Sequence, residues 1–156
     1  MRFNVVAFLD DIPLGAEFDP GDQPLHVTLV PPASTDAELG QLEASLEQVL
    51  AGFGPIEAEG GDDDLFGEDR DVEVTLVEDD GSLTRLHLEL LRALRPLAVR
   101  VGVPEHLGAG YRPHVTVRDD GRIERGESFE LDAVALLTRD DGGEDPWEVV
   151  AQFPLL

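Results

Sequence analysis

Two stretches of the chain place apolar residues at the spacing of one helix face. Such stripes predict amphipathic helices over residues 34–53 and 82–95. Thr35 and Glu38 fit a capping box for the first helix, and Pro96 closes the second. The stripes comprise Leu39, Leu42, Leu46, Val49, Leu50 and Phe53 in the first stretch, and Leu83, Leu86, Leu90, Leu91 and Leu94 in the second.

Between and around these stretches lie shorter runs rich in β-branched and aromatic residues, which predict strands. Segments rich in glycine, proline and aspartate predict loops, notably 10–24, 60–70 and 104–112. The predicted strands cover residues 2–9, 25–30, 55–60, 71–78, 97–103, 113–118, 127–139 and 147–153, the second of them ending at Pro31 and Pro32. The last two strands form a natural hairpin around a turn at 140–146.

This order of elements reads as a duplication. One half contains two strands, a helix and two strands, and the other contains a helix and further strands in a similar order. The pattern predicts the α+β class, with one helix in each half. The length of 156 residues suits one domain with a real core, and no linker separates the halves. We therefore expect a single bilobal domain over residues 1–156.

Composition limits the possible chemistry and the expected location of the protein. The chain has no cysteine, which excludes disulfides, thiolate nucleophiles and cysteine-based zinc sites. Its N-terminal apolar run is short and is followed by two acids, unlike a signal peptide, and no stretch approaches the length of a membrane span. We expect a cytoplasmic monomer without a membrane partner.

The net charge of −23 is unusual, and all eleven basic residues are arginine. One interpretation is a solvated acidic surface that reflects codon bias or a salty cytoplasm. The other is functional, because such a surface repels polyanions. In that case long nucleic acid is disfavoured, and a small nucleotide or an RNA end is the better partner.

One short motif occurs twice, as LHVTLV at residues 25–30 and PHVTVR at residues 113–118. In a strand, residues two apart point to the same face. His26 therefore shares a face with Thr28, and His114 shares a face with Thr116. Two imidazoles and two hydroxyls brought together would suit acid–base chemistry on a phosphate. The alternative is that each strand is simply buried and satisfies its histidine locally.

This doublet resembles the two-histidine (2H) phosphoesterase superfamily, most of all its 2'-5' RNA ligase-like branch, in which each half of a duplicated fold carries an H-x-T/S-x motif. Tyr111 and Arg112 before the second motif add to the resemblance. The resemblance implies two pseudo-symmetric lobes, each a small antiparallel sheet backed by its helix. It also implies that the two HxT strands face each other across a central cleft.

The residues allow a metal-independent reaction. One histidine takes a proton from water and the other protonates the departing ribose oxygen, while Thr28 and Thr116 donate hydrogen bonds to the phosphate. No cofactor is expected, since neither motif histidine has a carboxylate at a ligand spacing. Which histidine is the base stays open.

Further side chains could bind substrate. Arg118 shares the face of His114 by alternation, and Arg112 joins it if Pro113 keeps the register; either could grip a phosphate or pair with a nearby acid. Tyr111 is the first candidate to stack on a base, with Phe66 and Trp147 behind it, although each could be a packing residue. The other histidines, His87 on a helical stripe and His106 in a loop, are expected to be a core or boundary residue and a solvated residue, respectively.

The leading hypothesis is a phosphoesterase that acts on a 2',3'-cyclic phosphate or a 2',5'-linked nucleotide or RNA end, and that could also ligate in reverse. A second hypothesis is a nucleotide-binding module of the same fold without turnover. A third is an acidic protein-interaction domain in which the HVT pairs are structural.

Overall fold

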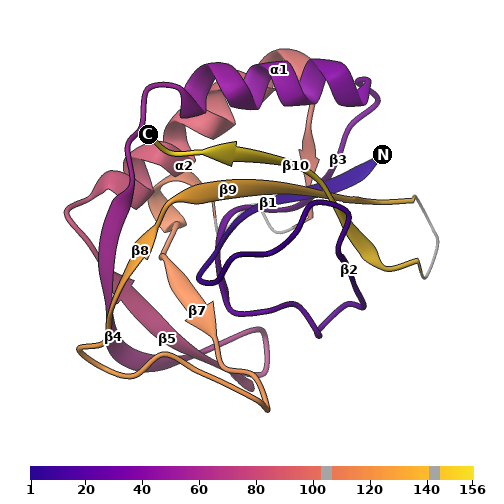
Figure 1. The fold of residues 1–156 in the computed structure, drawn as a ribbon. Helices are drawn as coiled ribbons and strands as arrows, with labels where there is room; N and C mark the ends of the chain where they lie inside the picture. Colours follow the sequence, from indigo (N-terminus) through magenta and orange to yellow (C-terminus); the bar gives the residue numbers. More distant parts are fainter. Residues whose placement is uncertain (103–106, 141–144) are drawn as a thin grey trace.

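The computed structural model describes residues 1–102, 107–140 and 145–156. Within them, ten strands form one curled, antiparallel sheet, and two α-helices lie together on one side of it (Figure 1). The helices are α1 (Leu39–Leu50) and α2 (Ser82–Leu94), with short 3-10 turns at Arg95–Leu97 and Gly108–Gly110. The strands are β1 (Arg2–Phe8), β2 (Glu17–Phe18), β3 (His26–Ser34), β4 (Ile56–Phe66), β5 (Val72–Glu78), β6 (Arg100–Val101), β7 (His114–Thr116), β8 (Ser128–Leu131), β9 (Ala133–Arg139) and β10 (Trp147–Pro154).

The sheet has two similar halves that meet at its centre. Its strand order is β2-β10-β9-β1-β3-β7-β5-β4-β8, and β6 pairs separately with β3. The junction of the halves is formed by β3 and β7, the strands that contain the two HVT motifs. The α+β class and the pseudo-symmetric arrangement are confirmed. The two motif strands pair directly, however, instead of standing apart across a cleft.

The main core lies between the helices and the sheet. Alternate residues of β1 and β3 point toward the helices, where Phe3, Val5 and Val27 pack with leucines of α1 and α2. The intervening residues of β1, Val6 and Phe8, point the other way into a second cluster that the segment between β1 and β3 partly covers. Strand alternation therefore gives the sheet a helix-covered face and an opposite face that is partly open.

Helix α1 begins later than predicted. Its first residue is Leu39, and its capping box joins Glu38 to Gln41. Thr35 is fully buried and bonded elsewhere, because its hydroxyl donates to the carbonyl of Leu97 at 2.8 Å and accepts from the amide of Ala37. The predicted box from Thr35 to Glu38 was wrong, since a tertiary contact takes the threonine.

Strand β3 continues through two prolines that were expected to end it. Val5 of β1 pairs with Val30, and Phe3 pairs with Ala33. Both prolines lie in the register shift between these pairs, where no ladder hydrogen bond requires their missing amide protons.

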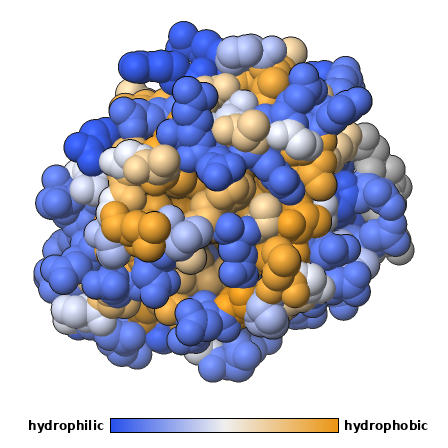
Figure 2. Space-filling view, turned by 45° about the horizontal axis from the view of Figure 1, so that its top comes forward, coloured by the Kyte–Doolittle hydropathy of each residue, from blue (hydrophilic) through white to orange (hydrophobic). Residues whose placement is uncertain are grey.

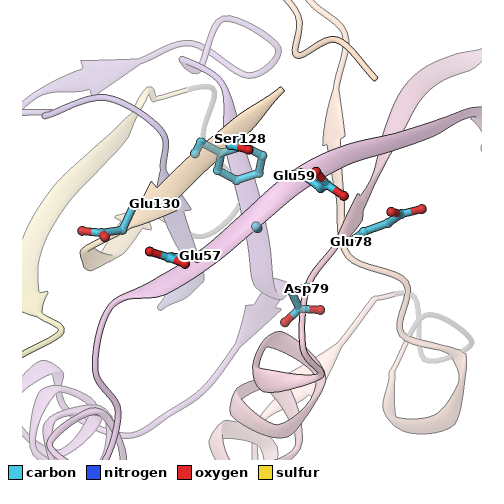
Figure 3. Close-up of a pocket in the computed structure, with 8 residues that line it drawn as sticks. Glu57, Glu59, Glu78, Asp79, Ser128 and Glu130 are labelled. Atoms are coloured by element: carbon cyan, nitrogen blue, oxygen red, sulfur yellow. The ribbon is translucent and has the colours of Figure 1, made fainter. Parts of the chain in front are cut away.

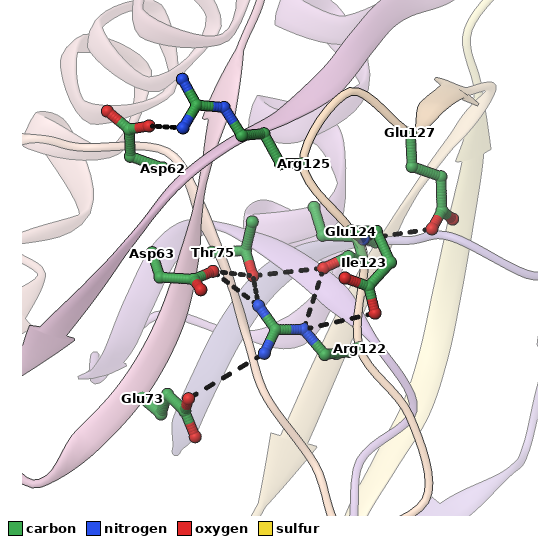
Figure 4. A network of polar contacts seen from close by, with 9 residues as sticks. All are labelled: Asp62, Asp63, Glu73, Thr75, Arg122, Ile123, Glu124, Arg125 and Glu127. Atoms are coloured by element: carbon green, nitrogen blue, oxygen red, sulfur yellow. Dashed lines mark hydrogen bonds and ion pairs between the residues drawn. The ribbon is translucent and has the colours of Figure 1, made fainter.

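Strand β4 also extends into a segment predicted as a loop. Acids of this strand are held by arginines that follow β7: Asp63 lies 2.5 Å from Arg122, and Asp62 lies 3.0 Å from Arg125 (Figure 4). Arg122 also contacts Thr75 of β5 at 3.2 Å. These contacts override the low strand propensity of glycine and aspartate.

Residues 127–139 form two strands where one was predicted. The break falls at Asp132, whose carbonyl accepts from the amide of Leu155 at 2.8 Å. Strand β8 pairs with β4, whereas β9 pairs with β1 and β10, so the segment passes from one half of the sheet to the other. The β9–β10 hairpin is confirmed, although residues 141–144 of its expected turn lie outside the described residues.

Hydrophilic residues cover much of the face shown in Figure 2, with hydrophobic residues between them. No helix in the described ranges has the length and apolar character needed to cross a membrane.

The close approach of Gly60 in β4 to the backbone of Glu124 gives a test of the course of this strand. A Cβ added at Gly60 would collide with the backbone carbonyl of Glu124, whereas one added at Gly40, on the exposed face of α1, meets nothing within 4 Å. We expect Gly60→Ala to lower the free energy of unfolding by about 1–3 kcal/mol and the control Gly40→Ala to raise it by about 0.5 kcal/mol. Urea unfolding measures the free-energy change for each variant. Equal changes for Gly60→Ala and Gly40→Ala would contradict the described course of β4.

Candidate active site

The two HVT motifs lie side by side at the centre of the sheet. Val27 of β3 is the cross-strand partner of Val115 of β7, and both valines are buried in the main core. Because the strands are antiparallel, this register sets His26 opposite Thr116 and Thr28 opposite His114. Alternation turns all four side chains to the face away from the helices, where each is half-buried. We call these four residues the His–Thr quartet.

Each histidine of the quartet is oriented by a backbone carbonyl two residues before it. Nδ1 of His26 lies 2.7 Å from the carbonyl oxygen of Pro24, and Nδ1 of His114 lies 2.8 Å from that of Arg112. A carbonyl only accepts, so Nδ1 carries the proton and donates in both cases. Nε2 of each ring is then the nitrogen that can exchange a proton with a substrate.

Each histidine also contacts the edge of a phenylalanine. The rings of His26 and Phe8 have centroids 5.8 Å apart at 72°, and those of His114 and Phe66 are 4.5 Å apart at 61°. Phe8 comes from β1 and Phe66 from β4, so each half of the sheet supplies one. The two histidines therefore have matching environments, as expected of a duplicated fold.

The pKa of His26 is lowered to about 4. Burial is the main cause, and the nearby charges of Arg118 and His114 lower it further, whereas the hydrogen bond to Pro24 acts in the opposite direction. His26 is consequently neutral at pH 7 and able to accept a proton at Nε2.

Arg118 stands at one end of the motif strands. Its guanidinium donates to the carbonyl of Gly21 at 3.0 Å. It lines a hollow of about 460 Å³ together with Gln23, Pro24 and three aspartates, Asp22, Asp119 and Asp120. We call this space the Arg118 hollow. The charge of Arg118 also lowers the pKa of His26, whose ring is bonded to the carbonyl of Pro24 in the same hollow.

Arg112 stands at the other end and is paired with an acid. It lies 2.6 Å from Asp64, whose pKa is lowered mainly by this hydrogen bond. Its guanidinium also lies 5.1 Å from the ring centroid of Phe66. Arg112 and Phe66 line a groove of about 210 Å³ with Thr28, Pro31, Pro32, Tyr111 and His114. We call this space the Phe66 groove.

Tyr111 links the two motifs. Its hydroxyl donates to the backbone carbonyl of Thr28 at 2.8 Å, and its ring stacks on His87 at 3.9 Å and 8°. Burial, with a smaller contribution from the charge of Asp79, raises the pKa of Tyr111. One face of the tyrosine ring is therefore already occupied, although the residue still lines the Phe66 groove.

The other two candidates in the described part of the chain, Trp147 and His87, are packing residues. Trp147 is only 4% exposed in the second cluster, among the partners of Phe8. His87 is fully buried: its Nδ1 donates to the carbonyl of Leu29 at 2.7 Å and its Nε2 accepts from the amide of Gly108, which confirms it as a core residue. His106 lies outside the described residues.

A hollow of about 600 Å³ lies elsewhere, over β4 and β8 (Figure 3). Its wall carries five carboxylates and no histidine or arginine, so it repels a phosphate. Those acids are Glu57, Glu59, Glu78, Asp79 and Glu130. In the described part of the chain no group of three or more histidine and acidic side chains is placed to hold a metal ion.

Sequence reasoning missed Phe8 and Pro24 as neighbours of the site. Phe8 is the cross-strand partner of His26, a pairing that depends on the β1–β3 register. Pro24 lies two residues before His26, and the repeated proximity of a carbonyl to each motif histidine was not visible in residue types alone.

The chain was compared with known families and structures. A family model for the 2'-5' RNA ligase superfamily matches residues 15–143. A crystal structure of TT0787 from Thermus thermophilus has a TM-score of 0.68 at 18% identity, covering 99% of this chain and 98% of that one. E. coli LigT complexed with NADP+ has a TM-score of 0.57 at 14% identity, and the match covers 99% of this chain and 96% of that one. LigT complexed with 3'-AMP has a TM-score of 0.55 at 15% identity, and the match covers 99% of this chain and 97% of that one. No curated protein sequence matches.

The family match spans well over half of the chain, so the chain belongs to the 2'-5' RNA ligase superfamily. This confirms the resemblance drawn from the two HVT motifs. The structural neighbours agree at the level of the fold. Membership supports an enzyme of the phosphoesterase or ligase type.

The hydrogen bond from Tyr111 to the backbone of Thr28 can be tested with Tyr111→Phe. This change keeps the ring on His87 but removes the donor to the Thr28 carbonyl. We expect the free energy of unfolding to fall by about 1 kcal/mol. Urea unfolding followed by the fluorescence of Trp147, the one tryptophan of the chain, measures the change. An unaltered midpoint would mean that solvent replaces the lost donor.

Proposed function

We propose that this protein is a metal-independent phosphoesterase that acts on a 2',3'-cyclic phosphate or a 2',5'-linked nucleotide or RNA end. The observation that carries the proposal is the His–Thr quartet, in which two histidines with matching Nδ1 anchors share one face of adjacent strands. In reverse, the same groups would join a cyclic phosphate to a 5'-hydroxyl.

The His26 pKa of about 4 favours this residue as the base. Nε2 of His26 takes a proton from water while the water oxygen bonds to phosphorus. As the bond from phosphorus to one ribose oxygen breaks, His114 gives a proton to that oxygen. Water is thus added across one ester bond, and the two histidines exchange their protonation states with solvent before the next turnover.

Thr28 and Thr116 are assigned to the phosphate oxygens. Neither hydroxyl has a hydrogen-bond partner among the described residues, so each can donate to a non-bridging oxygen. Arg118 adds a positive charge beside His26. Arg112 is less suited to this task, because Asp64 already holds it.

Small nucleotides are the substrate class that we propose. The structural neighbour LigT has been crystallised with 3'-AMP and with NADP+. The net charge of −23 disfavours long nucleic acid through repulsion. A short substrate with one phosphodiester avoids most of that cost.

The test is hydrolysis of the four 2',3'-cyclic nucleoside monophosphates in EDTA, at low and high salt, with phosphorus NMR to identify the product. We expect wild type to turn over and His26→Ala or His114→Ala to lose at least about a hundredfold in rate, since each removes an acid–base group. Thermal unfolding of each variant serves as the control for folding.

Turnover that survives both single substitutions would refute the assignment of the histidines. If no cyclic nucleotide is hydrolysed, titration calorimetry with the same nucleotides separates the alternatives. Binding without turnover would support the nucleotide-binding module, and the absence of both would leave the acidic interaction domain.

The pH profile provides a separate prediction. Protonation of His26 removes the base, so kcat/KM should fall on the acidic side near pH 4. The charge of Arg118 disfavours protonated His26, so Arg118→Gln should raise the His26 pKa. The acidic fall in kcat/KM, here called the acidic limb, should then move to higher pH.

Arg125→Gln is the matched control, because it removes the same charge from an exposed residue that pairs with Asp62. Arg125→Gln should leave the acidic limb of the kcat/KM profile at the same pH as in wild type. A limb that does not move with Arg118→Gln, or that moves equally with both changes, would show that His26 is not the group that titrates.

A further inference from the structure

Another hollow, away from the quartet, lies where β1 begins and β3 ends. Its volume is about 350 Å³, and Arg2, Ser34 and Arg100 line it together with the uncharged segments 32–33 and 101–102. None of the described acidic residues belongs to this wall, although the chain has 34 acidic residues and only 11 basic ones. We call this space the Arg2 hollow.

Strand register places the three polar side chains of the Arg2 hollow in one row. Arg2 of β1 is the cross-strand partner of Ser34 of β3, and Ser34 is also the partner of Arg100 of β6. Their neighbours Phe3 and Ala33 are buried in the main core, so alternation points Arg2 and Ser34 to the opposite face. Because adjacent strands lie about 4.8 Å apart, the two arginines start about 10 Å apart with the serine between them. Both long side chains can therefore reach one group that lies over the serine.

The positive charge of Arg2 is not neutralised within the described part of the chain. Its guanidinium forms no ion pair with a described acid and instead lies 6.0 Å from the ring centroid of Trp147. A contact with an aromatic face leaves the charge in place. Arg2 therefore keeps its capacity to bind an anion.

Arg100 is paired with an acid, but the pair is exposed. Its guanidinium lies 3.5 Å from Asp36, and the two side chains are 60% and 90% exposed. Such a pair contributes little to stability, because water screens both charges. Arg100 can exchange it for a stronger contact with an anion that also reaches Arg2.

Two guanidinium groups and a hydroxyl are well suited to a phosphate group. Each guanidinium can donate two parallel hydrogen bonds to phosphate oxygens, and the hydroxyl of Ser34 can donate another. A phosphate monoester or inorganic phosphate offers at least three oxygens, so both arginines can bind it at once. A carboxylate has only two oxygens and would satisfy one arginine.

The Arg2 hollow is too far from the quartet to share a phosphate with it. Ser34 comes six residues after Thr28 on β3, which corresponds to about 15–20 Å at the usual rise of a strand. A ligand in the Arg2 hollow therefore occupies a site of its own.

We propose that the Arg2 hollow is a second anion site, which binds a phosphate group as inorganic phosphate or as the monoester of a nucleotide. The inference goes beyond the proposed function, because the site lies outside the quartet and needs no turnover. The net charge of −23 opposes any anion at long range, so the affinity depends on the arginines of the hollow.

The experiment maps binding by NMR on ¹⁵N-labelled wild-type protein at low ionic strength. Inorganic phosphate, 5'-AMP and adenosine are titrated separately, and sodium chloride of matched ionic strength is the blank. We expect phosphate and 5'-AMP to shift the amide signals of Ser34 and Val101 with a Kd on the order of 1 mM. Adenosine and chloride should leave these signals in place. The amides of Val27 and Val115 report separately on binding at the quartet.

The two phosphate ligands distinguish the sources of the phosphate group. Equal affinities at Ser34 would support the proposal with inorganic phosphate as a sufficient ligand. Tighter binding of 5'-AMP would support it with a nucleotide monoester as the preferred ligand. Binding of 5'-AMP without any binding of inorganic phosphate would overturn it, because the nucleoside would then be the group that is recognised.

The variants are Arg2→Gln and Arg100→Gln, and the matched control is Arg92→Gln, which removes the same charge from an exposed position of α2. Each variant of the hollow should weaken phosphate binding at Ser34 at least about tenfold, since it loses charge-assisted hydrogen bonds. The control should bind as wild type does. The wild-type map tests the proposal even if a variant does not fold.

The proposal is overturned if phosphate shifts only the signals of the quartet strands, or if matched chloride produces the same shifts at Ser34. An equal loss of affinity in Arg92→Gln would also overturn it, because net charge and not the hollow would then attract the phosphate. The proposed function is tested by turnover, so either inference can fail alone.

Discussion

The direct pairing of β3 with β7 is the contact on which the rest of the site depends. Val27 and Val115 bury their side chains in the main core and fix the register of two strands that are far apart in the sequence. Because the side-chain period of a strand is two, that register turns both histidines and both threonines to the open face. A slip by one residue would bury the imidazoles and expose the valines. The same packing that joins the two halves therefore also assembles the chemistry.

The two halves repeat a simple means of holding a histidine and then differ in the charges around it. Each imidazole donates to a carbonyl two residues earlier and contacts one phenylalanine edge. Near His26, burial and the charge of Arg118 lower the pKa, whereas the arginine beside His114 is paired with Asp64. A duplicated fold thus anchors both histidines in the same way, whereas the partners of the nearby arginines differ between the two halves.

Arginine has several structural uses in this acidic chain. Arg122 and Arg125 hold acids of β4, which keeps a glycine- and aspartate-rich segment in a strand. That strand ends at Phe66, so these ion pairs help to place the aromatic wall of the groove. The acidic composition and the geometry of the site are therefore connected, because several acids that contribute to the net charge also position the elements around the quartet.

The sequence by itself determined the helices, most of the strands, the family and the four residues of the quartet. These depend on local periodicity and on a motif whose alternation needs no partner strand. The tertiary structure decided where β3 and β4 end, because a bulge accommodates Pro31 and Pro32 and distant arginines support Asp62 and Asp63. It also decided the surroundings of the site: the contact of Phe8 with His26, the stacking of Tyr111 on His87 and the pairing of Arg112 with Asp64. Each of these joins residues from different elements, and strand register and packing, which no local pattern encodes, bring them together.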